Sequence, residues 1–202
     1  MAPRPTSRAG IEEQNRLLLD RYRHFRLAAD AVTAAWQFHP HVMAVSLIGS
    51  VARDPWKEVP CFTPYRRARI ELWHECKDLD LALWLSDLSD LNALRRKSAA
   101  AVRKLMERRR IGVAAHQVDV FILEPGTDRY LGRLCAFNAC PKGKRECLVP
   151  GCGDMPFLRQ HDEFEWWADT LAPGRAVRLF DRASGTVATA ASLPLPETAE
   201  SG

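Results

Sequence analysis

The chain has 202 residues, a formal charge of +4, and hydrophobic and charged fractions of 47% and 27%. These values are normal for a globular protein and are sufficient for one domain with a substantial core. The mild positive charge is compatible with anionic ligands and does not by itself predict a nucleic-acid-binding protein. No apolar run approaches the ~20 residues that span a bilayer, and the basic N-terminus lacks the apolar region of a secretory signal. We therefore expect a cytoplasmic protein with no membrane partner.

The first half of the chain predicts two helices and two strands. Apolar residues at three- and four-residue spacing predict an amphipathic helix over residues 11–36. The apolar, β-branched run at 41–50 predicts a strand, and the proline-containing stretch 54–69 predicts an irregular excursion. A second strand is expected at 79–85 and a second amphipathic helix at 87–110.

The second half predicts shorter elements and a flexible end. The run "HQVDVFILE" at 116–124 predicts a third strand, which a turn-rich, cysteine-rich loop at 135–153 follows. We expect a helix over about 155–171 and a short strand at 176–182. Residues 183–202 are rich in Ser, Thr, Ala, Pro and Glu without periodicity, so we expect a disordered tail there.

Three aspartates on two of the predicted strands are the strongest chemical signal. Asp78 and Asp80 are two residues apart, so their side chains project to the same face of a strand. Asp119 lies in an otherwise apolar strand, where a carboxylate is costly unless it is at an edge, is paired, or binds a metal. If the two strands are neighbours, the carboxylates converge and could hold two Mg²⁺ ions about 3.5–4 Å apart for phosphoryl or nucleotidyl transfer.

A Gly-Ser pair at the end of the preceding strand predicts a phosphate-binding turn. Gly49 allows the backbone to approach phosphates closely, and successive N–H groups can bind an anion. The Ser50 hydroxyl can add a hydrogen bond, and Arg53 can contribute positive charge.

Together, Gly49-Ser50, Ala52-Arg53, Asp78-Leu79-Asp80-Leu81 and Asp119 resemble the polymerase-β-type nucleotidyltransferase superfamily, in particular its small bacterial nucleotidyltransferase-domain proteins. The resemblance implies an α/β (α+β) fold with a mixed β-sheet flanked by helices, as a single domain over 1–182 with its motif core at 42–123. It implies a Mg²⁺-dependent transferase that moves a nucleoside monophosphate from an NTP, with ATP expected, to an unidentified acceptor hydroxyl.

The resemblance also implies roles for the motif residues. Asp78 and Asp80 would bind the metal ions, and Asp119 would be the third carboxylate, which helps to activate the attacking hydroxyl. Gly49 and Ser50 would cradle the nucleotide phosphates.

Two departures from the compact family pattern keep other functions open. About 27 residues separate Ser50 from Asp78, and Asp54 stands where a glycine usually follows Arg53. A catalytically silent module that binds a nucleotide or a protein partner as a regulator is the main alternative. Binding of a nucleic acid through the basic helix 87–110, with the acids irrelevant, is a further alternative that we do not favour.

Four cysteines cluster in the turn-rich loop with the spacing C-x4-C-x6-C-x4-C. Cys135, Cys140, Cys147 and Cys152 could close a tetrahedral structural Zn²⁺ site, and His161 could replace one of them. Buried free thiols and disulfides are the alternative interpretations.

Overall fold

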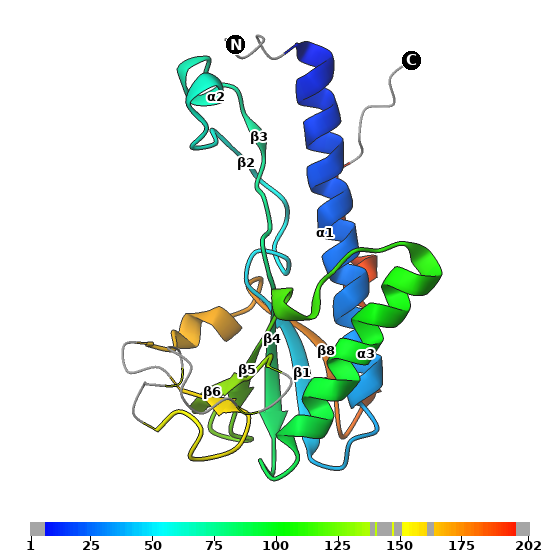
Figure 1. Cartoon of the computed structure of the whole chain (residues 1–202), viewed down its shortest axis with the longest axis vertical. Coiled ribbons are helices and arrows are strands. Elements are labelled where there is room, and N and C mark those ends of the chain that lie inside the picture. The colour runs from blue at the N-terminus through cyan, green and yellow to red at the C-terminus, as the bar shows by residue number, and fades with distance from the viewer. Residues whose placement is uncertain (1–6, 138–139, 141–146, 148–150, 161–163, 197–202) are drawn as a thin grey trace.

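The computed structural model of the chain describes residues 7–137, 140, 147, 151–160 and 164–196. Over these residues the protein is a mixed α/β structure with three helices and a seven-stranded sheet, beside a separate two-stranded hairpin (Figure 1). The helices are α1 (Arg8–Trp36), α2 (Thr63–Arg67) and α3 (Leu91–Arg109). The strands are β1 (Val42–Ile48), β2 (Lys57–Glu58), β3 (Leu72–Trp73), β4 (Leu79–Leu85), β5 (Val118–Leu123), β6 (Tyr130–Leu134), β7 (Leu158–Arg159), β8 (Val177–Asp181) and β9 (Gly185–Thr186). None of the described helices is both long and apolar enough to cross a membrane.

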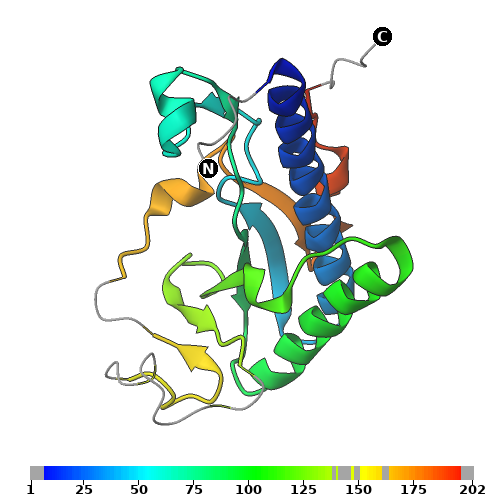
Figure 2. The same ribbon diagram turned by 45° about the horizontal axis from the view of Figure 1, so that its top comes forward.

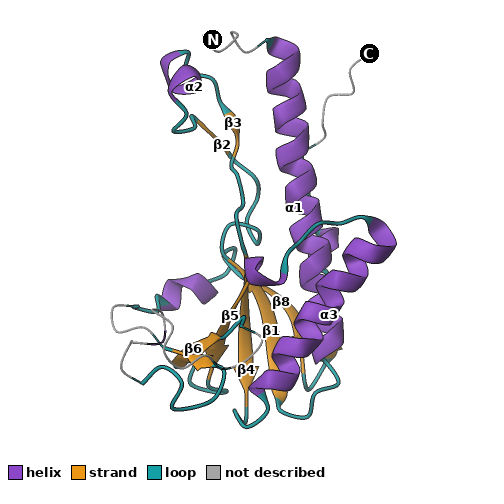
Figure 3. Cartoon of the chain, in the orientation of Figure 1, coloured by secondary structure: helices purple, strands orange, loops and turns teal. Residues whose placement is uncertain are grey.

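The sheet places the strands of the predicted motif side by side. Its order is β7-β6-β5-β4-β1-β8-β9, with β4 and β5 parallel and the other neighbouring pairs antiparallel. Because β1 runs antiparallel to β4, the C-terminal end of β1 lies beside the N-terminal ends of β4 and β5. The helices α1 and α3 cover one face, and the other face carries a separate, smaller apolar cluster (Figure 3).

The predicted apolar stripe of the first helix forms a large part of the main core. Ser7 caps the helix, since its hydroxyl accepts the Gly10 N–H at 3.1 Å. The stripe residues, which are at most 7% exposed, are Leu18, Tyr22, Phe25, Ala29, Val32 and Trp36. Burial of a stripe of this kind contributes about 1.5–3 kcal/mol per large side chain. The helix prediction is therefore confirmed, with the start moved to Arg8.

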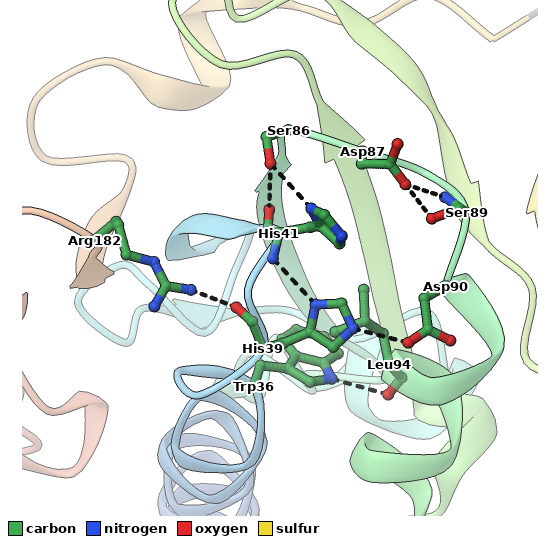
Figure 4. Close-up of polar contacts among 9 residues, drawn as sticks. All are labelled: Trp36, His39, His41, Ser86, Asp87, Ser89, Asp90, Leu94 and Arg182. Carbon is green, nitrogen blue, oxygen red and sulfur yellow. Dashed lines mark hydrogen bonds and ion pairs between the residues drawn. The ribbon is translucent and has the colours of Figure 1, made fainter.

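Polar contacts fix the edge of the sheet opposite the motif residues (Figure 4). The ring of His39 is buried, and its Nδ1 accepts the His41 N–H, so Nε2 carries the proton that it donates to Asp90 Oδ2 at 3.2 Å. Trp36 Nε1 donates to the Leu94 carbonyl at 2.9 Å. These contacts join the end of α1, and the segment that leads into β1, to the start of α3.

The segment after β8 is ordered, contrary to our expectation of a disordered tail from residue 183. Residues 183–196 include β9 and a short 3₁₀ turn, η4 (Ala190–Ser192). The Asp30 carboxylate accepts the N–H groups of Ala190 at 2.6 Å and of Ala191 at 3.0 Å, and Ala190 is fully buried. Side-chain capping from α1 thus orders a segment whose composition resembles a linker. Residues 197–202 lie outside the described residues.

A buried arginine of α1 connects this C-terminal segment to the turn after β1. The Arg26 guanidinium is 1% exposed and donates to the carbonyls of Val51 (3.2 Å), Arg53 (3.0 Å), Leu193 (3.0 Å) and Pro194 (3.0 Å). Burial lowers the pKa of Arg26, and these four carbonyl dipoles stabilise its positive charge. One side chain therefore links the turn after β1 to the C-terminal segment.

The helix predicted at 155–171 is wrong. Within the described part of that range the chain forms β7 and a four-residue 3₁₀ turn, η3 (Ala168–Leu171), and residues 161–163 lie outside the description. Phe164 and Trp166 are half-buried, whereas Glu165 and Trp167 are exposed. This alternation has the two-residue period of an extended chain. We call residues 164–171 the strap, because they lie over the open face of the sheet and pack against its smaller apolar cluster.

The stretch that follows the phosphate-binding turn forms a projecting arm, residues 54–77. It was expected to be irregular over 54–69; it is a β2–β3 hairpin with α2 at its tip, alongside the N-terminal half of α1 (Figure 1). Two contacts hold it to α1: Trp73 N–H donates to Asn15 Oδ1 at 2.8 Å, and Arg21 pairs with Glu75 at 3.8 Å.

We predict that Arg26→Met lowers the free energy of unfolding by about 3 kcal/mol, because four carbonyls lose their donor and one of them, that of Val51, is buried. Urea titration followed by circular dichroism measures this change. Arg23→Met is the matched control; Arg23 is on the same helix in an exposed ion pair with Asp20, and its loss costs at most about 0.5 kcal/mol. Equal losses in both variants would contradict the anchoring role of Arg26.

Candidate functional site

Two of the three predicted aspartates lie side by side on adjacent strands. In the β4–β5 ladder, Asp80 is the register partner of Asp119, and on its other side Asp80 is the register partner of Ile48. Both carboxylates therefore lie on the open face of the sheet, at the edge where β1 ends. The prediction that the strands of Asp80 and Asp119 are neighbours is confirmed.

Gly49 brings the turn after β1 against the Asp80 carboxylate. Its φ is +72°, in the left-handed region that side chains rarely adopt. A Cβ at this position would overlap Asp80 Oδ2 and lie 3.1 Å from Asp80 Cγ. Glycine is therefore required here both for its backbone conformation and for the close approach of the turn to the carboxylate.

The Asp80 carboxylate is held in a destabilised charged state. Burial raises its pKa to about 6; the Asp119 charge adds to the rise, Arg133 opposes it, and Asp78 contributes a smaller increase. Asp78 itself is exposed and precedes β4, so it acts on Asp80 from the rim of the site. A cation placed against Asp80 and Asp119 would relieve this repulsion.

An arginine that the sequence reasoning missed is part of the site. Arg133 of β6 forms an ion pair with Asp119, and its guanidinium lies over the Phe121 ring at 4.6 Å. Arg133 is register partner of Phe121 on the neighbouring strand, so its position follows from the β5–β6 ladder. Strand β6 was not predicted, and without that strand no sequence signal connected Arg133 to Asp119.

The remaining predicted phosphate ligands are near the site without facing the carboxylates. The Ser50 hydroxyl donates to Cys76 Sγ at 3.3 Å. The Arg53 side chain is exposed, and its carbonyl is one of the acceptors of Arg26. The structure thus brings Gly49, Asp80 and Asp119 together and leaves Ser50 and Arg53 in the adjoining turn.

A pocket of about 550 Å³ opens directly beside Asp80 and Gly49. The strap forms one wall with Phe164, Trp166 and the largely exposed Trp167, and the sheet forms the other. The lining residues are Ile48, Gly49, Asp80, Phe121, Phe164, Glu165, Trp166, Trp167 and Thr170. An aromatic-walled cavity of this volume suits a planar ring of a small ligand.

The aromatic walls pack on one another and leave polar atoms unpaired. Tyr130 and Trp166 are stacked with centroids 5.8 Å apart, and Phe164 lies 5.0 Å from Tyr130. Within the described residues, Trp166 Nε1, Tyr130 Oη and Arg133 Nε are buried without a hydrogen-bond partner. Buried donors are normally paired, and a ligand with acceptor atoms would satisfy Trp166 Nε1, which belongs to a residue of the pocket lining.

The donors at Asp80 and Asp119 fit a hard divalent cation. Two carboxylates in register, with the Gly49 backbone against one of them, are the oxygen chemistry that Mg²⁺ prefers. Among the described residues, no three His, Cys, Asp or Glu side chains are arranged closely enough to hold a metal ion as they stand. Binding of Mg²⁺ at Asp78, Asp80 and Asp119 therefore stays a prediction.

The four loop cysteines are close enough to influence one another. Burial raises the pKa of the Cys147 thiol, and Cys152, Cys135 and Cys140 each add to the rise. All four are free thiols, and Cys140 Sγ would lie 3.7 Å from a Cβ at Gly153, next to Cys152. Zinc binding by these thiols stays a prediction, and His161 lies outside the described residues.

The raised pKa of Asp80 predicts a pH-dependent stability in the absence of divalent ions. A carboxyl whose pKa is higher in the folded protein adds stability below pH ~4, and that contribution is lost as the pH rises through about 6. Asp80→Asn should therefore stabilise the EDTA-treated protein by about 2 kcal/mol at pH 8 and have little effect at pH 4. Urea unfolding at both pH values measures this. The exposed Asp54→Asn serves as the control, and a stabilisation independent of pH would contradict the burial argument.

The cysteine loop predicts one bound zinc per chain. Protein purified without chelator should contain about one equivalent of zinc by mass spectrometry of metals, and Cys152→Ser should lose it. Cys61→Ser, which removes an exposed thiol on the arm, should retain it. A metal-free wild type that folds normally and binds no added zinc would refute the prediction.

Comparisons with models of known protein families, with curated proteins and with solved structures each found no match. The functional interpretation therefore depends on the geometry of the site and on the order of its motifs along the chain.

Proposed function

We propose that the protein is a Mg²⁺-dependent nucleotidyltransferase of the polymerase-β type. The observation that carries the proposal is the contact of Gly49 with Asp80, beside Asp119 on the adjacent parallel strand. A turn that requires glycine against the partly buried carboxylate of Asp80, beside a second carboxylate, has no evident structural benefit. It is the arrangement needed to hold a metal-bound triphosphate between backbone N–H groups and acids.

The order of the elements supports the same family. A strand that ends in Gly-Ser, a strand with Asp at its start, and a parallel strand with the third Asp lie adjacent in a mixed sheet. Helices α1 and α3 cover the face away from the carboxylates. The mixed sheet and the neighbouring positions of these strands support the proposal.

The proposed reaction follows from the positions of these residues. The acceptor hydroxyl oxygen forms a bond to the α-phosphorus of the NTP, and the bond from that phosphorus to the bridging oxygen of the β-phosphate breaks. Pyrophosphate leaves with the electron pair, and the hydroxyl proton passes to the Asp119 carboxylate. Mg²⁺, when bound by Asp78, Asp80 and Asp119, would neutralise charge on the phosphates. The Gly49-Ser50 turn orients the triphosphate.

The aromatic pocket supplies a place for the nucleoside. It adjoins Asp80 and Gly49, so a base in the pocket beside the strap would leave its phosphates at the turn. Trp166 Nε1 is the unpaired donor that a base or ribose oxygen would satisfy.

A second candidate function has its own supporting observation. Arg133 already neutralises Asp119, as a cation would, and the Ser50 hydroxyl is engaged with Cys76. In a silent, nucleotide-binding regulator these contacts would persist, and binding would not require Mg²⁺.

We predict that one or more of the four NTPs binds with micromolar affinity only when Mg²⁺ is present. Asp80→Asn/Asp119→Asn should weaken this binding about tenfold or more, and Gly49→Ala should do the same because its Cβ displaces Asp80. Isothermal titration of each NTP, with Mg²⁺ or with EDTA, measures this.

Gly126→Ala is the matched control, since Gly126 also has a positive φ but has open space around it. Trp166→Ala should weaken the Mg²⁺-dependent NTP binding, because its ring lines the pocket. Binding that is equal in EDTA would favour the silent regulator. No binding to the folded wild type would refute the nucleotidyltransferase and the nucleotide-binding regulator, and would favour a silent module that binds a protein partner.

A further inference from the structure

We infer that the arm (residues 54–77) docks the acceptor, and that this acceptor is a single-stranded polynucleotide with a free terminal hydroxyl. The inference rests on the proposed function and names the substrate class of the same site. The observations that carry it are the position of the arm and the side chains at its tip.

The arm is attached at the two edges of the candidate site. It leaves the turn that contains Gly49 and returns directly into Asp78 and β4. Figure 2 shows the arm and η3 on the same side of the molecule, away from α3. A molecule held at the tip would therefore lie over the side of the sheet on which Asp80 and the strap meet.

The tip carries three arginines between two bordering acids, Glu58 and Glu71. Residues 59–70 contain Arg66, Arg67 and Arg69 and no Asp or Glu. All three arginines are exposed, and the ion pairs of the described arm residues use other side chains, His74 with Glu58 and Glu75 with Arg21. Free guanidinium groups of this kind bind phosphates.

Aromatic side chains accompany these charges, and they distinguish a single strand from other anions. Phe62 is 60% exposed, and its ring centroid lies 5.5 Å from that of Tyr65. Exposed rings beside arginines stack on unpaired bases at about 1–3 kcal/mol per base. A duplex hides its bases from such rings.

The more basic helix α3 does not offer the same combination. Its cations border a groove whose floor is mostly alanine, and it packs on the face of the sheet opposite the carboxylates. This helix provides a charge-matched control for the arm. Arg96 and Arg108 are exposed there, as Arg66 and Arg67 are on the arm.

The test measures anisotropy of fluorescein-labelled 12-nucleotide RNA and DNA single strands, and of the DNA duplex, with wild-type protein at several salt concentrations. We expect single strands to bind more tightly than the duplex. Arg66→Ala/Arg67→Ala should weaken binding about tenfold or more and make the slope of log K against log salt shallower by about 1.4. Phe62→Ala/Tyr65→Ala should weaken binding about tenfold and leave the slope unchanged. Arg96→Ala/Arg108→Ala should retain wild-type affinity.

Two readouts separate this inference from the proposed function. Mg²⁺-dependent NTP binding should be unchanged in all arm variants, whereas extension of a labelled strand by one nucleotide should fall with strand affinity. A preference for RNA or for DNA in both assays identifies the type of strand. The inference is overturned if the α3 variant loses as much affinity as the arm variants, if duplex binds as well as single strands, or if polyglutamate competes as well as the oligonucleotide.

Discussion

The buried guanidinium of Arg26 is the interaction on which the candidate site depends most directly. From α1 it donates to carbonyls of two segments, the turn after β1 and the C-terminal segment. The turn is also held by its own side chains, since Val51 and Ala52 are buried in the main core and the Ser50 hydroxyl donates to Cys76 Sγ. Because Arg26 fixes Val51 and Arg53 from behind, Gly49 can stay against Asp80 although the two residues belong to different strands. The geometry of the site is therefore set by a residue that does not touch it.

The negative charge of Asp80 is destabilised by its surroundings, and a bound cation would relieve this. Asp80 is buried beside Asp119, and one arginine, Arg133, compensates for only part of the negative charge. Folded proteins seldom keep such a pair for stability, because apolar residues at the same register would pack at no charge penalty. The unpaired Trp166 Nε1 and Tyr130 Oη lie on the same face of the sheet. Repelled acids and unpaired donors next to one cavity both indicate that a bound ligand completes this face.

The elements that the sequence predicted well are those with a single dominant period. The stripe of α1 and the apolar strands β1, β4 and β5 were found because burial of one helical face, or of a whole strand, leaves a regular pattern. The strap was predicted as a helix because Phe164, Trp166 and Trp167 are apolar, although their burial alternates as in an extended chain. The tail was missed because its order comes from partners distant in sequence, Arg26 and Asp30, which composition cannot reveal. Among the site residues, Asp80, Asp119 and Gly49 were identifiable from strand position, whereas Arg133 required the pairing of β5 with β6.

The long insertion between Ser50 and Asp78, which departs from the compact motif in the sequence, forms a separate arm in the folded protein. The arm leaves and re-enters the sheet at one place, with β2 paired to β3 along its length. The contacts of Trp73 with Asn15 and of Glu75 with Arg21 hold it on α1. Since the arm neither separates Gly49 from Asp80 nor lines the pocket beside them, the insertion leaves the motif geometry intact. What it adds is a surface of arginines and aromatic rings outside the site, and residues on that surface can change without disturbing the contact of Gly49 with Asp80.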